Sequence, residues 1–147
     1  MRILKAGLTY FLRVFGAGFA LAFLRIPFLV PTFGTRTAEL MEMPVMLAVI
    51  AWVSHRLVRD HPQLTRLHWL GVGLLALACM VAAELAVAYL LGARSPSEYI
   101  AGRDPVSGSV YLASLILLSV APTFWSRRPR PQPSSKPASL ARPRARR

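Results

Sequence analysis

The stretch Trp69–Leu91, WLGVGLLALACMVAAELAVAYLL, decides the fold class of this chain. It carries a single charged residue, Glu84, in 23 positions. A helix needs about 20 mainly apolar residues to cross the hydrocarbon core of a bilayer, and its backbone polar groups must be satisfied within the segment. A helix of a soluble protein would instead show a polar stripe every three or four residues. The stretch therefore predicts a membrane-spanning helix.

Three more apolar segments lie on either side of this stretch. Together they predict an all-α fold: an integral membrane bundle of four transmembrane helices within residues 1–126. Period-2 alternation, which a membrane barrel would require, is absent from all four segments. The expected helices cover about 6–30, 37–58, 68–92 and 109–125.

The first segment also has features of a cleavable signal peptide. A basic start precedes an apolar run, and ALA at 20–22 matches the small-x-small pattern of a cleavage site. However, Arg13 shortens the apolar run, and the chain stays apolar through FLRIPFLVP after the supposed cut. We therefore expect a retained first helix.

The C-terminal segment 127–147 is strongly basic. The chain has 18 Lys and Arg against 6 Asp and Glu, and eight of the basic residues lie in this segment together with five prolines. Such a composition is typical of a disordered chain. We expect a tail that contacts anionic lipids, at about 1 kcal/mol for each basic residue near the surface. No motif in it indicates nucleic-acid binding.

The distribution of Lys and Arg residues, those of the tail included, predicts the orientation. With four spans, the N-terminus, the middle loop and the C-terminal tail share one side, which holds fourteen basic residues against four on the other. The lipid bilayer is then the main partner. The expected location is the bacterial inner (cytoplasmic) membrane, multi-pass, with both termini in the cytoplasm.

In this topology several charged residues fall in the non-cytoplasmic leaflet. Glu42 would lie about 7 to 8 Å below that surface and Glu84 roughly 10 Å below it, at 1.5 Å per helical residue. Glu39 and Glu42 are three apart and share a helix face. We expect at least one of the glutamates to meet an arginine. The predicted buried charge cluster comprises Arg25, Arg36, Glu39, Glu42 and Glu84.

Pro44 lies just behind Glu42 and predicts a helix kink. A proline cannot donate to the carbonyl four residues earlier and crowds it, so the helix should bend or loosen there. A carbonyl freed beside a carboxylate could help to bind a cation or water.

Several interpretations of the cluster stay open, and one of them is an ordinary position of these residues at the membrane interface. The preferred one is a polar clamp that sets helix register, at about 1 kcal/mol for each polar contact between membrane helices. The second is an ion or proton pathway, because an ionisable residue at membrane depth is by default a functional-site hypothesis. The third is a site for a ligand or a lipid headgroup.

Catalytic and metal-binding patterns are missing from the sequence. The single cysteine, Cys79, excludes an intrachain disulfide and paired-cysteine metal sites. His55, His61 and His68 are six and seven residues apart, which does not place them on one helical face. There is no nucleophile–base pair and no phosphate-binding loop. We expect a protein that is not an enzyme and has no cofactor and no metal.

Two motifs resemble those of a group of small uncharacterised bacterial four-helix inner-membrane proteins. They are FLRIPFLVPTFGTRTAELMEMPVMLA at 23–48 and AAELAVAYLLG at 82–92. The resemblance supports the topology and implies no activity. We expect a non-enzymatic structural or accessory protein. The alternative is a small oligomeric transporter or channel subunit that binds a proton or cation through Glu42 and Glu84. A homo-oligomer or another membrane partner stays open.

Overall fold

The computed structural model describes residues 2–90, 92 and 104–126, and this part of the chain is all-helical, as predicted. The expected disordered tail, 127–147, lies outside the described residues. So do residues 91 and 93–103. The elements are α1 (Arg2–Leu24), the π-helical segment η1 (Arg25–Leu29), α2 (Val30–Asp60), α3 (Arg66–Leu90) and α5 (Pro105–Trp125).

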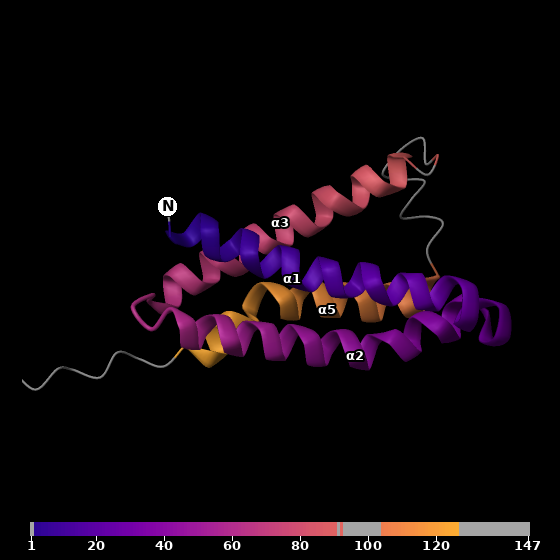
Figure 1. Ribbon diagram of the computed structural model, residues 1–147, viewed down its shortest axis with the longest axis horizontal. Coiled ribbons are helices and arrows are strands. Elements are labelled where there is room, and N and C mark those ends of the chain that lie inside the picture. Colours follow the sequence, from indigo (N-terminus) through magenta and orange to yellow (C-terminus); the bar gives the residue numbers. More distant parts are fainter. Residues whose placement is uncertain (1, 91, 93–103, 127–147) are drawn as a thin grey trace, which may run out of the picture.

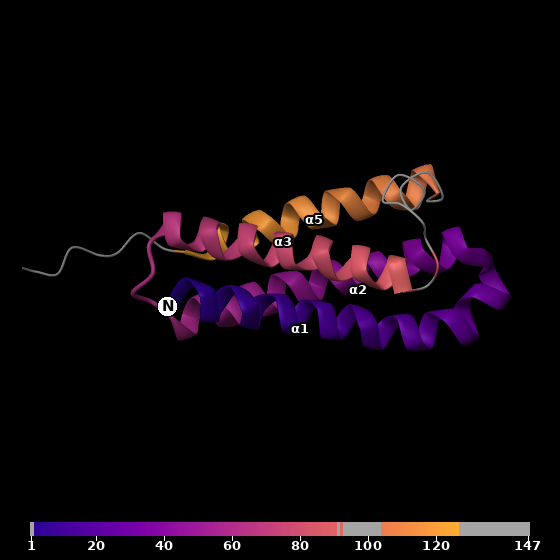
Figure 2. The same ribbon diagram turned by 90° about the horizontal axis from the view of Figure 1, so that it is seen from above.

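The helices run back and forth along one long axis (Figures 1 and 2). Helices α1 and α2 are antiparallel and joined by η1 at one end of the molecule, which we call the turn end. The start of α1, the connection between α2 and α3, and the end of α5 lie at the opposite, N-terminal end. There the Arg66 Nε donates to the Ser126 carbonyl oxygen at 3.2 Å, which joins α3 to the end of α5.

The turn between α1 and α2 depends on prolines and one glycine. The Val30 N–H donates to the Arg25 carbonyl, a wide π-helical turn around Pro27, and Pro31 has no N–H to continue the regular ladder. Gly34 then adopts φ 78° and ψ 162°, a conformation that side chains strongly disfavour. The prediction of a non-helical loop at 31–36 is therefore wrong, because this connection is helical except at Gly34.

Helix α5 begins four residues earlier than the predicted start at 109. Asp104 is its N-cap, and the carboxylate accepts from the backbone N–H groups of Val106 at 3.0 Å and Ser107 at 3.1 Å. Pro105 follows at the first helical position, where its missing N–H costs nothing. The capping residues thus explain the earlier start.

The tightly packed core lies where α1, α2, α3 and α5 all meet. Tyr10 is fully buried, and its hydroxyl donates to the Leu118 carbonyl at 3.1 Å. Gly73 on α3 faces the backbone of Ser119 on α5 so closely that a Cβ would overlap the Ser119 carbonyl oxygen. The largest apolar side chains buried here are Tyr10, Val14, Leu57, Trp69, Val72 and Leu118.

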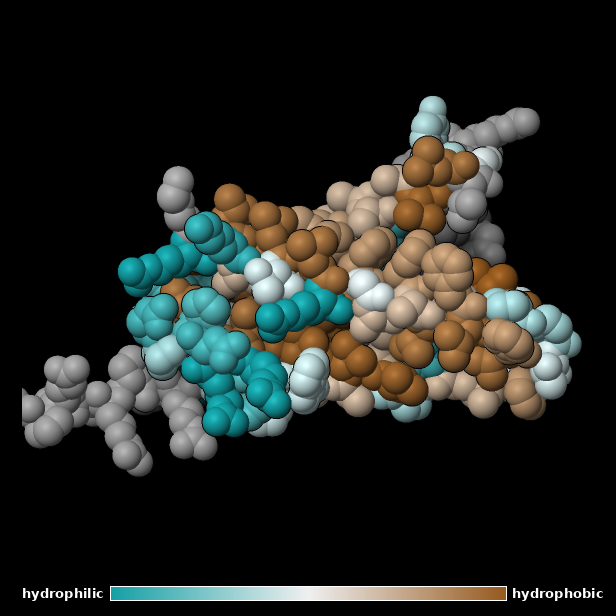
Figure 3. All heavy atoms as spheres, in the orientation of Figure 1, coloured by the Kyte–Doolittle hydropathy of each residue, from teal (hydrophilic) through white to brown (hydrophobic). Residues whose placement is uncertain are grey.

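The outward faces of the helices are mostly apolar (Figure 3). Leu12, Ile26, Leu74 and Ile116, for example, are exposed. Three helical stretches of the described chain are long and apolar enough to cross a membrane by length and composition, and the first, of 59 residues, contains α1, η1 and α2. Hydrophilic side chains gather at the N-terminal end. They include the exposed basic residues Arg2, Lys5, Arg56, Arg59 and Arg66.

Candidate functional site

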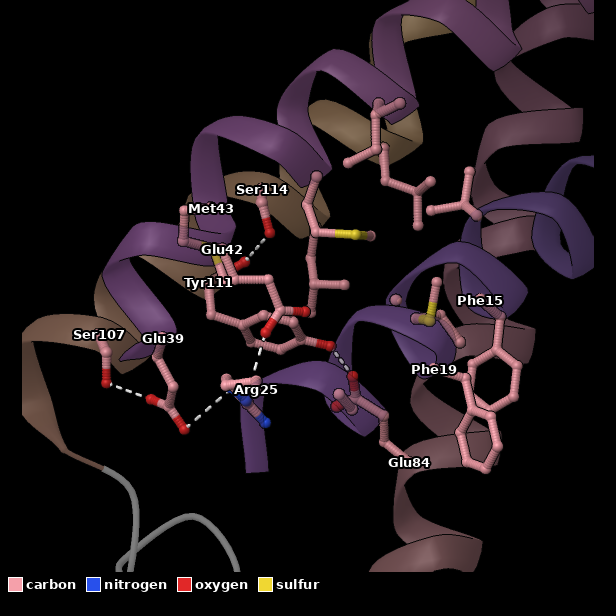
Figure 4. Close-up of a pocket in the computed structure, with 18 of the residues that line it drawn as sticks. Phe15, Phe19, Arg25, Glu39, Glu42, Met43, Glu84, Ser107, Tyr111 and Ser114 are labelled. Atoms are coloured by element: carbon pink, nitrogen blue, oxygen red, sulfur yellow. Dashed lines mark hydrogen bonds and ion pairs between the residues drawn. The ribbon is translucent and has the colours of Figure 1, made fainter. Parts of the chain in front are cut away.

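Arg25 joins the turn to α2 through two carboxylates. Its Nη1 lies 3.5 Å from Glu39 Oε1, and its Nε lies 3.2 Å from Glu42 Oε2. The glutamates are one turn apart on α2, so one guanidinium from η1 reaches both (Figure 4). These two contacts alone join three of the five residues of the predicted cluster.

Glu42 is the more deeply placed of the two glutamates. Its side chain is only 10% exposed, and its Oε2 accepts no hydrogen bond among the described residues. The Arg25 Nε is likewise buried without a hydrogen bond. The two atoms are close enough for an ion pair but are not aligned for a hydrogen bond. Glu42 Oε2 therefore keeps unused capacity to accept one.

Helix α5 supplies donors to the other two glutamates. The Ser107 Oγ donates to Glu39 Oε2 at 2.6 Å, and the Tyr111 hydroxyl donates to Glu84 Oε1. Ser107 and Tyr111 are four residues apart, hence on one face of α5. The hydrogen bond from Tyr111 thus connects Glu84, on α3, to α5. Together with the bond from Ser107 to Glu39, it links α2, α3 and α5 at the turn end (Figure 4).

Arg36 is not part of this cluster, contrary to our expectation. Its Nε and Nη2 donate to Asp104 Oδ2 at 2.7 and 2.5 Å, and its side chain is 58% exposed. The reason is local, because the N-cap of α5 places an exposed carboxylate beside the start of α2. The Arg36 guanidinium, helped by the backbone N–H groups of Ser107 and Val106, holds the pKa of the Asp104 carboxyl below its usual value.

Pro44 lies within α2 without a break in helical backbone angles. The interior residue of α2 with non-helical angles is Gly34, ten positions earlier. The non-helical residue thus lies at the turn, and the bend that we predicted at Pro44 stays a prediction. Glu42 and Glu39 stay on one regular helical face, and this regularity allows both to contact Arg25.

A cavity of about 310 Å³ lies beside the charged residues. Its polar end is formed by Arg25, Glu39, Glu42, Glu84, Ser107 and Tyr111. Apolar side chains from α1, α2, α3 and α5 form the remainder, among them Phe15, Met46, Met80 and Leu118. Four of the five residues of the predicted charge cluster, all except Arg36, thus line one cavity.

The sequence interpretation missed the contribution of α5 to this site. Ser107, Tyr111 and Ser114 follow an i, i+4, i+7 spacing, which places them in one polar stripe along a mainly apolar helix. That stripe is the signal that could have revealed it. Two serines of α5 bond back to their own helix, as serines in helices often do. The Ser114 Oγ donates to the Tyr111 carbonyl at 2.6 Å, and the Ser119 Oγ donates to the Ile116 carbonyl at 2.7 Å.

No group of three His, Cys, Asp or Glu side chains within residues 2–90, 92 and 104–126 is arranged to hold a metal ion. Comparisons with protein-family models, curated proteins and solved structures found no match for this chain.

Proposed function

We propose that this chain is an integral protein of the bacterial inner membrane, spanned by α1, α2, α3 and α5, with both termini in the cytoplasm. Apolar side chains on the outward helix faces support lipid contact, because a water-soluble protein rarely exposes such continuous apolar surface. The exposed basic residues at the N-terminal end support the orientation, because positive residues favour the cytoplasmic side. The basic tail adds contacts with anionic lipids.

Within the membrane we propose a non-enzymatic, structural or accessory role based on an ion-pair clamp. The observation that carries it is the double contact of Arg25 with Glu39 and Glu42. An unpaired charge in an apolar environment is costly, so the three residues favour the one helix register in which they meet. The clamp would hold the α1–α2 turn in a defined shape that a membrane partner or a second copy could recognise.

A charge swap tests the clamp directly. The double variant Arg25→Glu with Glu42→Arg restores an ion pair between the same two positions, with the guanidinium now on α2 and the carboxylate on η1. We expect each single change to lower the melting temperature of the purified protein, and the swap to recover part of the loss. A swap that melts no higher than the worse single variant would contradict the clamp.

A second candidate function is a small transporter or channel subunit. It is favoured by one observation, that Glu42 and Glu84 come from different helices yet line the same cavity. Its test is ion or proton flux into liposomes that contain the purified chain. Glu84→Gln should abolish the flux while the melting temperature stays close to that of the unchanged protein, whereas an absence of flux in the unchanged protein would contradict this function.

A further inference from the structure

One outward face of α1 changes its chemistry along the helix. Lys5, Thr9 and Arg13 follow one another at steps of four residues, so they lie on one side of the helix. Gly16 and Ala20 continue the same line towards the turn end. All five residues are exposed except Thr9, which is half-buried. The face is therefore basic and polar near the N-terminal end, where hydrophilic side chains gather in Figure 3, and small and apolar beyond Arg13.

Arg13 is a charged residue without a partner in the part of the chain that the structure describes. The ion pairs there involve Arg25 and Arg36, and the cation–π contact joins Arg56 to Trp52. An unpaired guanidinium on a helix face that contacts lipid is costly. Arg13 therefore requires an anionic group from outside the described chain.

The positions of two arginines on α2 indicate how deep Arg13 lies. Arg36 and Arg56 are both exposed and are twenty residues apart. This spacing is about 30 Å along a helix, which is the thickness of the hydrocarbon core of a bilayer. Helices α1 and α2 are antiparallel, and Arg25 meets Glu39. Twelve residues from this contact along each helix lead to Arg13 and to a position five residues before Arg56. The backbone of Arg13 thus lies about 7 to 8 Å inside the level of Arg56.

Helix geometry favours a position of the Arg13 guanidinium near the cytoplasmic headgroups. In an α-helix the Cα–Cβ bonds tilt towards the N-terminus, and α1 starts at the N-terminal end of the molecule. A long basic side chain with this tilt keeps its stem among apolar groups and brings its charge to the interface. It then passes over Thr9, one turn earlier on the same face. Phosphate groups are the anions found at that level of a bilayer.

We infer that α1 carries a binding site for an anionic phospholipid of the cytoplasmic leaflet. The phosphate accepts hydrogen bonds from the Arg13 guanidinium and the Thr9 hydroxyl, and a guanidinium matches a phosphate with two parallel N–H donors. The acyl chains lie along Gly16 and Ala20, and the space around Gly16 is open. Lys5, one turn nearer the cytoplasm, attracts a headgroup of net negative charge and repels the cationic group of a zwitterionic lipid.

This inference rests on the proposed membrane insertion and orientation, and it adds a defined site to the general attraction between the basic tail and anionic lipids. Reporter fusions test the orientation in cells, whereas lipid titration of the purified protein tests the site. If the fusions support the orientation and the variants below bind lipid as the unchanged protein does, the site alone is wrong.

The test is native mass spectrometry of the full-length protein in maltoside micelles, titrated with phosphatidylglycerol. The control lipid is phosphatidylcholine with the same acyl chains, which has the same phosphate but no net charge. We expect the first phosphatidylglycerol to bind at least about tenfold more tightly, because two basic residues face the headgroup. Equal affinities of the two lipids would overturn the inference.

Two variants locate the binding on α1. Arg13→Gln should weaken phosphatidylglycerol about fivefold, as expected for the loss of one basic residue at the headgroup. Thr9→Val keeps the charge and the shape but removes the hydroxyl, and should weaken it about threefold. The matched control is Arg146→Gln, which removes one positive charge from the tail and should change the affinity by less than about twofold, because seven basic residues remain there. Equal losses in Arg13→Gln and Arg146→Gln would show attraction by bulk charge and overturn the site.

Thermal melting in lipid-free micelles completes the test. Arg13→Gln should melt as the unchanged protein does, because no partner of Arg13 is lost from the described chain. A lower melting temperature without lipid would indicate a partner within the protein and overturn the inference. So would a second membrane protein that co-purifies only with the unchanged chain while Arg13→Gln binds phosphatidylglycerol normally, since Arg13 would then pair with a carboxylate of that protein.

Discussion

Arg25 Nε lies 3.2 Å from Glu42 Oε2, and this contact joins the π-helical turn to α2. Both side chains are largely buried, so neither charge can be solvated well if the other is removed. The contact is therefore a sensitive place to measure what the charges contribute to stability.

Arg25→Gln and Glu42→Gln should each destabilise the protein, because each leaves a charge without its partner. In water-soluble proteins that cost is on the order of 3 to 5 kcal/mol. The double variant should lose less than the sum of the two, because neither charge is then isolated. The measurement is the free energy of unfolding in detergent, with Asp60→Asn as the control. Strict additivity would contradict the clamp.

Ser107→Ala should destabilise the turn end. Its Oγ donates to Glu39 Oε2 at 2.6 Å, and a hydrogen bond to a charged group contributes about 1.5 to 3 kcal/mol. Ser109→Ala is the matched control, because the Ser109 Oγ bonds only back to the Val106 carbonyl within the described chain. We expect the control to stay within about 0.5 kcal/mol of the unchanged protein. Equal effects of the two changes would show that the contact with Glu39 adds no stability.

Gly73→Ala should destabilise the packing of α3 against α5. The new Cβ would overlap the Ser119 carbonyl oxygen, and backbone cannot move aside as a side chain can. Overpacking of this kind costs about 1 to 3 kcal/mol. Gly71→Ala, two positions away on the same helix, meets only Ile3 Cγ2 at 3.8 Å and should be neutral or slightly stabilising. Thermal melting of both variants distinguishes a close helix contact from a general intolerance of alanine.

The exposed pair of Arg36 and Asp104 should make stability depend on pH in the acid range. Because Arg36 and two backbone N–H groups lower the Asp104 pKa in the folded protein, the contribution is complete above the unfolded value, about 3.9. It is lost as the pH falls through the lower, folded value. The measurement is the melting temperature as a function of pH. Asp104→Asn, which keeps a capping side chain, should reduce this dependence on pH, and Asp60→Asn should not. An unchanged slope in Asp104→Asn would contradict the role of the pair.

Reporter fusions test the proposed orientation. Fusions after Arg66 and Ser126 should read cytoplasmic, because both lie at the N-terminal end of the molecule. Fusions at Gly34 and Gly92 should read external, because Gly34 lies in the first part of α2 and Gly92 just after the end of α3. A cytoplasmic signal at Gly92 would be incompatible with four spans.

The sequence by itself determined the helical character of the chain and the apolar nature of its surface. Hydropathy is a property of each segment, so a stretch such as Trp69–Leu91 predicts an apolar helix without knowledge of its neighbours. Sequence spacing also placed Glu39 and Glu42 on one face, since three residues nearly complete a helical turn. Both features follow from local geometry alone.

Only the tertiary structure decided which charges meet. Arg25 and Arg36 look equivalent in the sequence, yet the turn at Gly34 brings Arg25 to Glu42, and the N-cap of α5 attracts Arg36 to Asp104. Tyr111 reaches Glu84 because α3 and α5 pack together with one particular rotation about their axes. These pairings depend on the angle of a turn and the rotation of whole helices. Neither quantity is encoded in the composition of any single segment.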